Sequence, residues 1–500
     1  MQTDVPLRSA VVDLGSNSVR LVVFEGISRN PVPIFNEKVV LKLGQGLTKT
    51  GRLNESGVER AFEVLSRFYA IAHSMGASPF EILATAAVRD ARNGAEFIDS
   101  IRRWMPDVPI RILSGEEEAD HSATGVRCGI PEADGLAADI GGGSLELIHL
   151  TRTERLESTS LPLGVIRLRD RSGGVLAQAA SIAGEDITGV SWLSQVKGKT
   201  LYLVGGAFRA LARLQIARTG YPLNILHYYT LSCAEATEMA DWLIATSRRT
   251  LERLPHAPRK RLDDVPFAAT VLRRLIRNVV PDRIVFCVDG LREGWYALNV
   301  AQSLQSQDPV IARAHEMCIR LGRSNELPRA LFSWTDSLFP DETAGERRLR
   351  EAACWFSDTG SHDHPEYRAW QSYLRVLLVH GGGFDHHARV FLALVLAVRY
   401  EAGPEEAFLA PSRQLLNEAD FRKAMILGLA LRLACSLSGG TETLLRGTEL
   451  IFKGKRISLR LTSACVAVQS DSVRRRLIRL GQVMGMETGI EDEYVPLMEE

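Results

Sequence analysis

Short apolar runs rich in β-branched residues alternate with amphipathic stretches from the N-terminus to about Gln302. Ala10–Val12 and Leu21–Phe24 predict strands. Val58–Met75 predicts a helix, because its apolar positions recur three or four residues apart, and Asn54 is a suitable N-cap for it. This alternation predicts an α/β sheet region.

After this region the pattern changes to long helical segments rich in Ala, Leu and Arg, such as Ala388–Arg399 and Phe421–Leu437. Glu449–Phe452 and Ile457–Leu461 flank a Lys-Gly-Lys turn, which predicts a hairpin before a final basic helix. A chain of 500 residues is too long for one core. We therefore expect four domains, with the bounds 1–124, 125–301, 302–445 and 446–500.

Composition places the chain among folded proteins of the cytoplasm. Hydrophobic residues make up 45% and charged residues 24%, and the net charge is zero, so an anion site needs local clusters of Lys and Arg. The seven cysteines include no C-x-x-C pair, which favours reduced thiols. No signal-peptide pattern opens the sequence, and the apolar run Val390–Val398 is about half of the roughly 20 residues that cross a bilayer. We expect no export and no membrane span.

An internal repeat is the most informative feature. Val11–Val22 aligns with Ala137–Ile148, and each copy consists of a strand, an Asp, a Gly/Ser turn and a second strand. Two such hairpins in successive α/β domains predict a duplicated fold whose halves face each other across a cleft.

The turns of this repeat suit phosphate. Gly and Ser allow backbone N–H groups to converge on an anion, and Ser hydroxyls add donors. Each turn nevertheless begins with a carboxylate, Asp13 or Asp139, and two like charges about 4 Å apart repel by roughly 4 kcal/mol at an effective dielectric near 20. A bridging divalent cation resolves this conflict. Mg²⁺ fits, and Mn²⁺ prefers similar oxygen ligands.

The repeat resembles the two phosphate loops of the exopolyphosphatase/guanosine pentaphosphate phosphohydrolase family, at Asp13–Ser18 and Asp139–Glu146. The resemblance implies metal ligands at Asp13, Asp139 and Glu146. It implies phosphate contacts at Gly15, Ser16, Asn17, Ser18, Gly141, Gly142, Gly143 and Ser144.

Two connecting segments extend this resemblance. Ala84–Asn93 is similar to a family motif whose arginine approaches the terminal phosphate, which implies that Arg89 clamps the transferred group. Ser114–Ala119 is similar to the segment with the catalytic glutamate. The match implies that Glu118 deprotonates the attacking water, with Glu117 the alternative because three glutamates are adjacent.

Later segments resemble the family less closely. Gly205 and Gly206 lie in a strand-turn-helix segment similar to the nucleoside-side motif of the actin-like superfamily, and a simple turn explains them nearly as well. Val285–Gly294 is similar to the motif that closes the second domain. The helical region resembles phosphohydrolases with a His-Asp dyad, but Ser357 precedes Asp358 where the histidine would stand, so we do not expect a metal site there.

The resemblance implies two actin-like (ribonuclease H-like) α/β domains that flank a cleft, followed by an α-helical HD-like region. The expected activity is hydrolysis of terminal phosphate from inorganic polyphosphate. Guanosine pentaphosphate is the rival substrate, with the tetraphosphate as product. An actin-like kinase or ATPase and a catalytically silent sensor are alternatives of other classes.

The expected partners are polyphosphate or these guanosine nucleotides, and a second copy of the chain in a homodimer. Arginine clusters around Arg248–Arg261, Arg273–Arg277 and Arg474–Arg479 are candidates for holding a phosphate chain. Nucleic acid is not expected as a partner, because no reading module or aromatic platform accompanies these charges.

Overall fold

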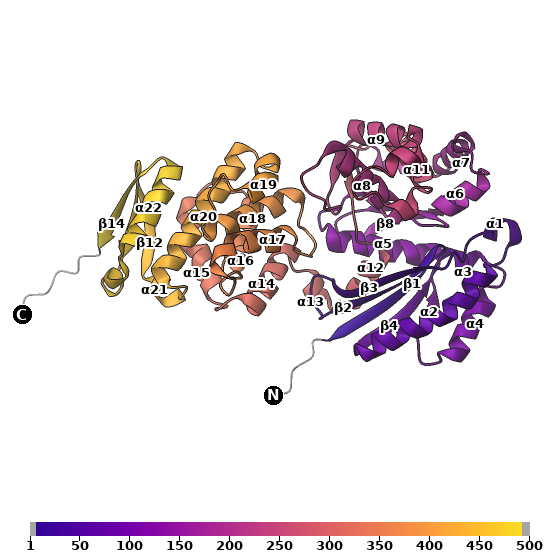
Figure 1. Cartoon of the computed structure of the whole chain (residues 1–500), viewed down its shortest axis with the longest axis horizontal. Coiled ribbons are helices and arrows are strands. Elements are labelled where there is room, and N and C mark those ends of the chain that lie inside the picture. The colour runs from indigo at the N-terminus through magenta and orange to yellow at the C-terminus, as the bar shows by residue number, and fades with distance from the viewer. Residues whose placement is uncertain (1–6, 493–500) are drawn as a thin grey trace, which may run out of the picture. The chain divides into compact units, whose positions relative to one another are not determined.

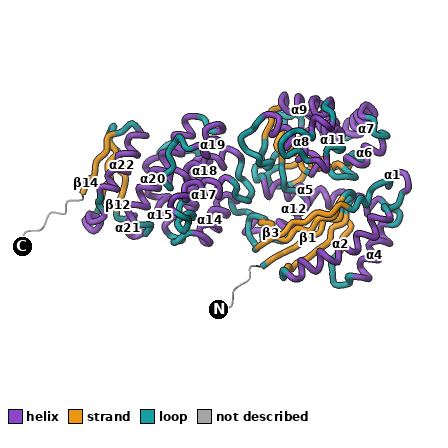
Figure 2. Tube along the Cα trace, viewed as in Figure 1, coloured by secondary structure: helices purple, strands orange, loops and turns teal. Residues whose placement is uncertain are grey.

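The computed structural model describes residues 7–492 and divides the chain into two compact units between Ser306 and Gln307 (Figure 1). Strands are concentrated in the first unit, whereas the second is mainly helical (Figure 2). Each unit is described by itself.

The first unit contains two sheets. The N-terminal sheet has the strand order β3-β2-β1-β4-β5, in which the first three strands are antiparallel neighbours and the last three are parallel. Its strands are β1 (Arg8–Leu14), β2 (Ser18–Glu25), β3 (Val32–Val40), β4 (Ala77–Ala84) and β5 (Ile110–Ile112).

The second sheet has the order β8-β7-β6-β9-β11-β10, which repeats the first order and adds one edge strand. Its strands are β6 (Gly135–Ile140), β7 (Leu145–Leu150), β8 (Arg155–Leu161), β9 (Thr200–Val204), β10 (Thr230–Ser232) and β11 (Arg283–Phe286). The two halves of the sequence repeat form the equivalent hairpins β1-β2 and β6-β7. The predicted duplicated α/β fold is therefore confirmed.

Helices cover both faces of each sheet. The outer face of the first sheet packs on α2 (Glu55–Ser74) and α4 (Gly94–Trp104), and Asn54 caps α2 as predicted by accepting from the Gly57 N–H. The outer helices of the second sheet are α6 (Val165–Arg171), α7 (Leu176–Thr188), α8 (Gly206–Thr219), α9 (Cys233–Ala245) and α11 (Val265–Val279). The inner faces form separate smaller cores.

Two helices, α5 (Gly115–Gly129) and α12 (Leu291–Leu298), fill the space between the sheets (Figure 1). Helix α5 packs on the second sheet, and Trp295 and Tyr296 of α12 pack on the first. The backbones touch where they cross. A Cβ on Gly294 would lie 1.8 Å from the His121 carbonyl oxygen, and one on Gly125 would lie 2.1 Å from that of Gly290.

The second unit consists of packed helices followed by a small sheet. Its longer helices are α14 (Pro309–Leu321), α16 (Ala344–Phe356), α17 (Arg368–Leu377), α18 (His386–Arg399) and α20 (Glu418–Ser438). Every residue of the apolar run Val390–Val398 is buried in α18. The predicted hairpin is confirmed as β12 (Thr448–Lys453) and β13 (Arg456–Leu461), followed by the basic helix α22 (Asp471–Met484) and by β14 (Glu487–Asp492).

The glycine crossing gives a stability prediction. We expect Gly294→Ala to lower the free energy of unfolding of the first unit by roughly 1–3 kcal/mol, because the new methyl group overlaps a backbone oxygen that cannot rotate away. Urea unfolding followed by circular dichroism measures this change.

Gly184→Ala is the matched control, because Gly184 is also helical and its added methyl group would meet only the Arg274 side chain, at 3.5 Å. Alanine has the higher helix propensity, so this variant should be as stable as the wild type or more stable. Equal destabilisation of both variants would contradict the crossing argument.

Candidate functional site

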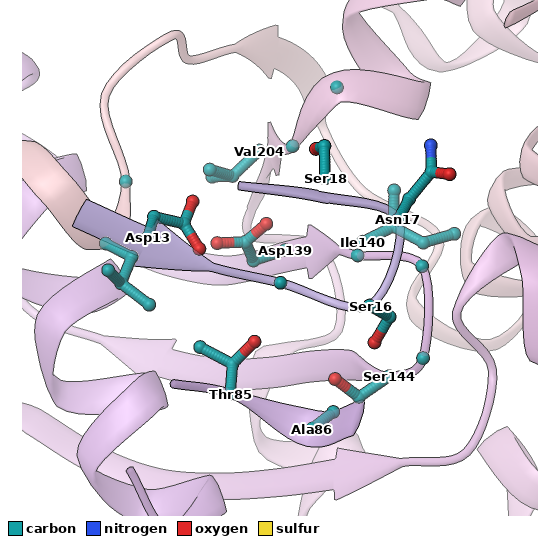
Figure 3. Close-up of a pocket in the computed structure, with 18 of the residues that line it drawn as sticks. Asp13, Ser16, Asn17, Ser18, Thr85, Ala86, Asp139, Ile140, Ser144 and Val204 are labelled. Carbon is teal, nitrogen blue, oxygen red and sulfur yellow. The ribbon is translucent and has the colours of Figure 1, made fainter. Parts of the chain in front are cut away.

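The two repeat hairpins enclose a cavity of about 160 Å³ in the first unit. The carboxylates of Asp13 and Asp139 face each other across it (Figure 3). Glu118, at the start of α5, and Glu146, on β7, complete an acidic cluster. All the predicted phosphate contacts line the cavity, namely Gly15, Ser16, Asn17, Ser18, Gly141, Gly142, Gly143 and Ser144.

The two phosphate loops are in direct contact. A Cβ on Gly142 would lie 3.3 Å from the Ser16 Cβ, and one on Gly143 would lie 2.8 Å from the Ser16 Oγ. Ser16 and Ser144 extend from the two loops into the same region (Figure 3). Only glycine allows the loops to approach this closely, which explains why the second turn is richer in glycine than the first.

Protein donors hold three of the four carboxylates. Ser122 Oγ donates to Asp139 at 2.7 Å, and Ser160 Oγ donates to Glu146 at 3.0 Å. Arg89 Nη1 donates to Glu118 Oε2 at 2.9 Å. Glu146 also accepts a hydrogen bond from Ser144, and Arg292 Nη1 lies 3.8 Å from Asp13 Oδ2.

Burial raises the pKa of all four carboxyl groups. For Glu118 the pKa rises to about 7, because burial and the charges of Asp139 and Asp13 outweigh the opposing effect of Arg89. Burial also raises the pKa of Asp13, Asp139 and Glu146. A buried carboxylate cluster of this kind favours bound protons or a bound cation.

The chemistry of this donor set suits a hard divalent cation, because Asp13, Asp139 and Glu146 supply carboxylate oxygens to one cavity, the ligands that Mg²⁺ and Mn²⁺ prefer. Their oxygens do not all lie within 4.8 Å of one another, so a cation would be held by fewer than three of them, with waters or phosphate oxygens as its other ligands. A divalent cation would remove the mutual repulsion that contributes to their raised pKa values.

The side chains of Glu118 and Glu117 have different surroundings: Glu118 lines the cavity and Glu117 does not. The Glu117 carboxylate accepts from the Ser114 N–H at 2.8 Å and completes a capping box at the start of α5, outside the cavity. Arg89 also lies outside the lining. Its guanidinium is committed to Glu118 and to the Leu113 carbonyl oxygen, so in this structure it contacts the glutamate and not the cavity.

Five cations also line the cavity, namely Arg20, Lys38, Arg209, Arg261 and Arg292. Arg261 belongs to a cluster that the sequence had already indicated, whereas the other four were not predicted. The cations adjoin the carboxylates, since Arg292 Nη1 lies 3.8 Å from Asp13 Oδ2. Strand pairing places Arg20 directly opposite Asp13 on β1 and opposite Lys38 on β3. The internal repeat could have indicated Arg20. Arg20 aligns with Glu146, and because Glu146 pairs with Asp139 in the second hairpin, Arg20 is expected beside Asp13 in the first.

Gly205 and Gly206 also line the cavity. Gly205 has a φ of +96°, and a Cβ there would lie 2.9 Å from Asp139 Oδ1, so this turn requires glycine. A Cβ on Gly206 would lie 2.7 Å from a guanidinium nitrogen of Arg261. Of the arginine clusters considered from the sequence, only Arg261 reaches this cavity.

Two other clusters have structural explanations. His227, Cys287 and Asp289 lie within metal-ligand range of one another, but both ring nitrogens of His227 face backbone groups, Val288 N and Gly129 O. In the second unit Asp358 is buried and paired with Arg323 at 2.7 Å. Among residues 7–492, no His/Cys/Asp/Glu group with metal-ligand spacing occurs in that unit.

Two sheets of equivalent topology, each contributing a Gly/Ser loop and a carboxylate to one cavity, define the class of the first unit as an actin-like α/β phosphate-binding fold. The Ppx/GppA phosphatase family model matches residues 22–301, and the model described as exopolyphosphatase, C-terminal, matches residues 310–490. The chain belongs to the Ppx/GppA phosphatase family.

Curated relatives include two proteins of Mycobacterium tuberculosis. Exopolyphosphatase 1 is 33% identical over 165 residues, which are 32% of this chain and 48% of the relative, so the match spans about half of that protein. Exopolyphosphatase 2 is 26% identical over 290 residues, which are 54% of this chain and 91% of the relative.

Solved structures resemble the first unit. An exopolyphosphatase from Cytophaga hutchinsonii has a TM-score of 0.53 and 26% identity, over 59% of this chain and 99% of that one. A Ppx/GppA family member from Aquifex aeolicus has a TM-score of 0.50 and 24% identity, over 58% and 96%. The second similarity concerns the fold alone.

No helix in the part of the chain described by the structure is long and apolar enough to span a membrane.

The burial of Glu118 predicts a pH-dependent stability. Its pKa is about 7 in the folded protein against an ordinary 4.5, so the folded state loses stability relative to the unfolded state as the pH rises from 4.5 to 7. Glutamine does not titrate, so the stability of Glu118→Gln does not decrease for this reason over that pH range. We expect the Tm of the variant, relative to the wild type, to increase by a few degrees between pH 5 and pH 8.

Thermal unfolding in EDTA at both pH values measures this difference. Glu116→Gln removes the same charge from an exposed position in the same turn and corrects for the loss of net charge. A Tm difference for Glu118→Gln that does not change with pH would contradict the burial argument.

Proposed function

We propose that this protein hydrolyses the terminal phosphate of inorganic polyphosphate and releases orthophosphate, with Mg²⁺ or Mn²⁺ held by the carboxylate cluster. The names of the relatives and the membership of the family support a phosphoanhydride hydrolase. The choice of polyphosphate rests on one observation, the set of five cations that line the cavity together with the carboxylates.

Members of this cation set repel one another, although Arg292 lies 3.8 Å from Asp13 and Arg261 lies 3.9 Å from Asp264. Arg20 and Lys38 are directly opposite on neighbouring strands, an arrangement that destabilises a sheet. Burial, together with Arg261, Arg20 and Arg209, lowers the pKa of Lys38 to about 8. Burial and the neighbouring Arg292 and Arg209 lower the pKa of Arg20 to about 10. A multiply charged anion would relieve this repulsion.

A polyphosphate chain is charged along its whole length, and it suits a cavity that several cations line. Its terminal phosphate would lie at the two Gly/Ser loops beside Glu118, and the following charged units would extend along the cations. A nucleotide instead places an uncharged nucleoside beyond its last phosphate. The Arg261 guanidinium lies against Gly206, so the turn expected to face a nucleoside presents a cation.

The chain's own residues account for the positioning and the proton transfer. The backbone N–H groups and hydroxyls of the two loops would orient the terminal phosphate, and Glu118 in its ionised form would accept the proton of the attacking water. Arg89 would hold the Glu118 carboxylate in place through its bond to Oε2. Residues from the set Asp13, Asp139 and Glu146 would hold a divalent cation, which would supply positive charge to offset the charge that develops on the phosphate.

The first test measures orthophosphate release from long-chain polyphosphate, guanosine pentaphosphate and ATP, each with Mg²⁺ and with EDTA. We expect rapid release from polyphosphate with Mg²⁺, little release in EDTA, and a decrease in kcat of about 10²- to 10⁴-fold in Glu118→Gln, because the proton acceptor is lost.

Glu117→Gln is the matched control, since glutamine can also complete the capping box and the position lies outside the cavity. It should keep nearly full activity. Preference for guanosine pentaphosphate would move the assignment to the rival activity of the same family. Preference for ATP would indicate an ATPase or kinase, and no release from any substrate would favour a sensor.

The pH dependence of kcat/KM for polyphosphate should be bell-shaped. Activity should rise as Glu118 ionises, because it must be ionised to accept a proton; with a bound cation this limb should lie below the pKa of about 7 that Glu118 has without one. Activity should fall through a pKa of about 8 as Lys38 loses its charge. Initial rates between pH 5 and pH 10 give both limbs.

Lys38→Arg should remove the falling limb and leave the rising one, because arginine stays charged throughout this range. Lys38→Gln should lower kcat/KM at pH 7 by about 10-fold, the cost expected for losing one hydrogen bond from a charged donor. Lys49→Gln, at an exposed position on the surface helix α1 (Leu47–Thr50), should leave the profile unchanged. A falling limb retained in Lys38→Arg would contradict this role.

A further inference from the structure

A second cavity of about 240 Å³ lies in the first unit, lined by residues different from those of the catalytic pocket. It is formed where α5 and α12 end, between the loop after β2 and the turn between β7 and β8. The residues that line it are Ser28, Arg29, Thr124, Arg127, Cys128, Pro131, Arg152, Thr153, Tyr296, Ala297, Val300 and Gln305.

The lining is basic. It includes Arg29, Arg127 and Arg152 and contains no Asp or Glu. Arg29 is only 7% exposed, and burial lowers the pKa of Arg127, so these two cations are partly removed from water. The Arg127 guanidinium donates to the Thr153 carbonyl oxygen and reaches Thr124 Oγ1 at 3.5 Å, and both of these partners are uncharged.

The negative end of α5 is covered at this cavity. A helix C-terminus carries partial negative charge on its last carbonyl groups and would repel an anion. Here Arg29 Nη1 donates to the Cys128 carbonyl oxygen at 3.1 Å, and His227 Nε2 lies 3.2 Å from that of Gly129. The arginines therefore determine the charge that a ligand meets.

The size and the donors of the cavity indicate a compact oxyanion. Its volume is below the roughly 300–1,000 Å³ of pockets that hold drug-sized ligands. Ser28, Thr124 and Thr153 also line the cavity, and Thr124 Oγ1 lies 3.5 Å from Arg127 Nη2. Planar guanidinium groups bind phosphate through paired N–H donors.

We propose that this cavity is a second phosphate site, in which Arg29, Arg127 and Arg152 bind orthophosphate or pyrophosphate. Neither the family match nor the catalytic proposal assigns a ligand here, and the inference does not rest on the proposed function. Arg29 follows a strand of the first sheet and Arg152 a strand of the second, so a bound anion ties the two lobes together.

The same helix connects this site to the catalytic pocket. Arg127 lies nine residues after Glu118 on α5, which is about 13 Å at 1.5 Å per residue. The Gly125 and Gly294 contacts fix α5 against α12 between these positions. An anion that favours one arrangement of the two lobes also favours one conformation of the catalytic pocket, because both lobes line it.

The test is calorimetric titration of the full chain with orthophosphate and, separately, with pyrophosphate, at constant ionic strength set by chloride. We expect one class of site at this cavity and, on the proposed function, a second class at the catalytic pocket. Arg152→Ala, on an exposed turn, and Arg127→Gln should each weaken one class by at least about 10-fold and leave the other unchanged, since each loses charge-assisted hydrogen bonds. The stronger ligand identifies which of the two anions the cavity prefers.

Arg277→Ala is the matched control, because Arg277 is an exposed arginine of α11 outside both cavities. It should leave both classes intact. Titrations of Arg152→Ala and Arg127→Gln that match the wild type would overturn the proposal. So would an equal loss in Arg277→Ala, which would indicate a general effect of net charge. In crystals soaked with selenate, anomalous scattering beside Arg152 would locate the site, and scattering confined to the catalytic pocket would contradict it.

Discussion

The first unit depends on the direct backbone contact between α5 and α12. Each helix follows one lobe in the sequence and packs on the sheet of the other, so the two lobes share one interior. Gly125 and Gly294 permit the contact, since any side chain there would overlap a carbonyl group of the partner helix. This crossing brings Glu118, from the start of α5, and Arg292, from the start of α12, to the same cavity.

The duplicated hairpins make the cavity electrostatically asymmetric. Both copies place an aspartate at the end of the first strand, but the residue opposite it is Arg20 in one copy and Glu146 in the other. The first hairpin therefore pairs its aspartate with a cation, whereas the second pairs its aspartate with another carboxylate.

Burial lowers the stability of the charged groups that line this cavity, both the carboxylates and the cations. It raises the pKa of the carboxyl groups and lowers that of Lys38 and Arg20, so it shifts each group towards its uncharged form. Charges kept buried without full compensation are typical of functional sites. The arginine cavity at the opposite end of α5 also contains a buried cation, Arg29, and no carboxylate lines it.

The sequence alone was sufficient to predict the duplicated α/β fold, the helical region after it, and the two Gly/Ser turns that line the cavity. These features depend on local periodicity and on turn chemistry, which residues close in the chain determine. The positions of the adjacent Glu117 and Glu118 stayed open until the helix was seen, because a capping box and a cavity position differ only in three dimensions. The meeting of Lys38 and Arg261 at one cavity, and the second cavity, also required the tertiary structure, since strand pairing and the α5–α12 crossing join residues far apart in the sequence.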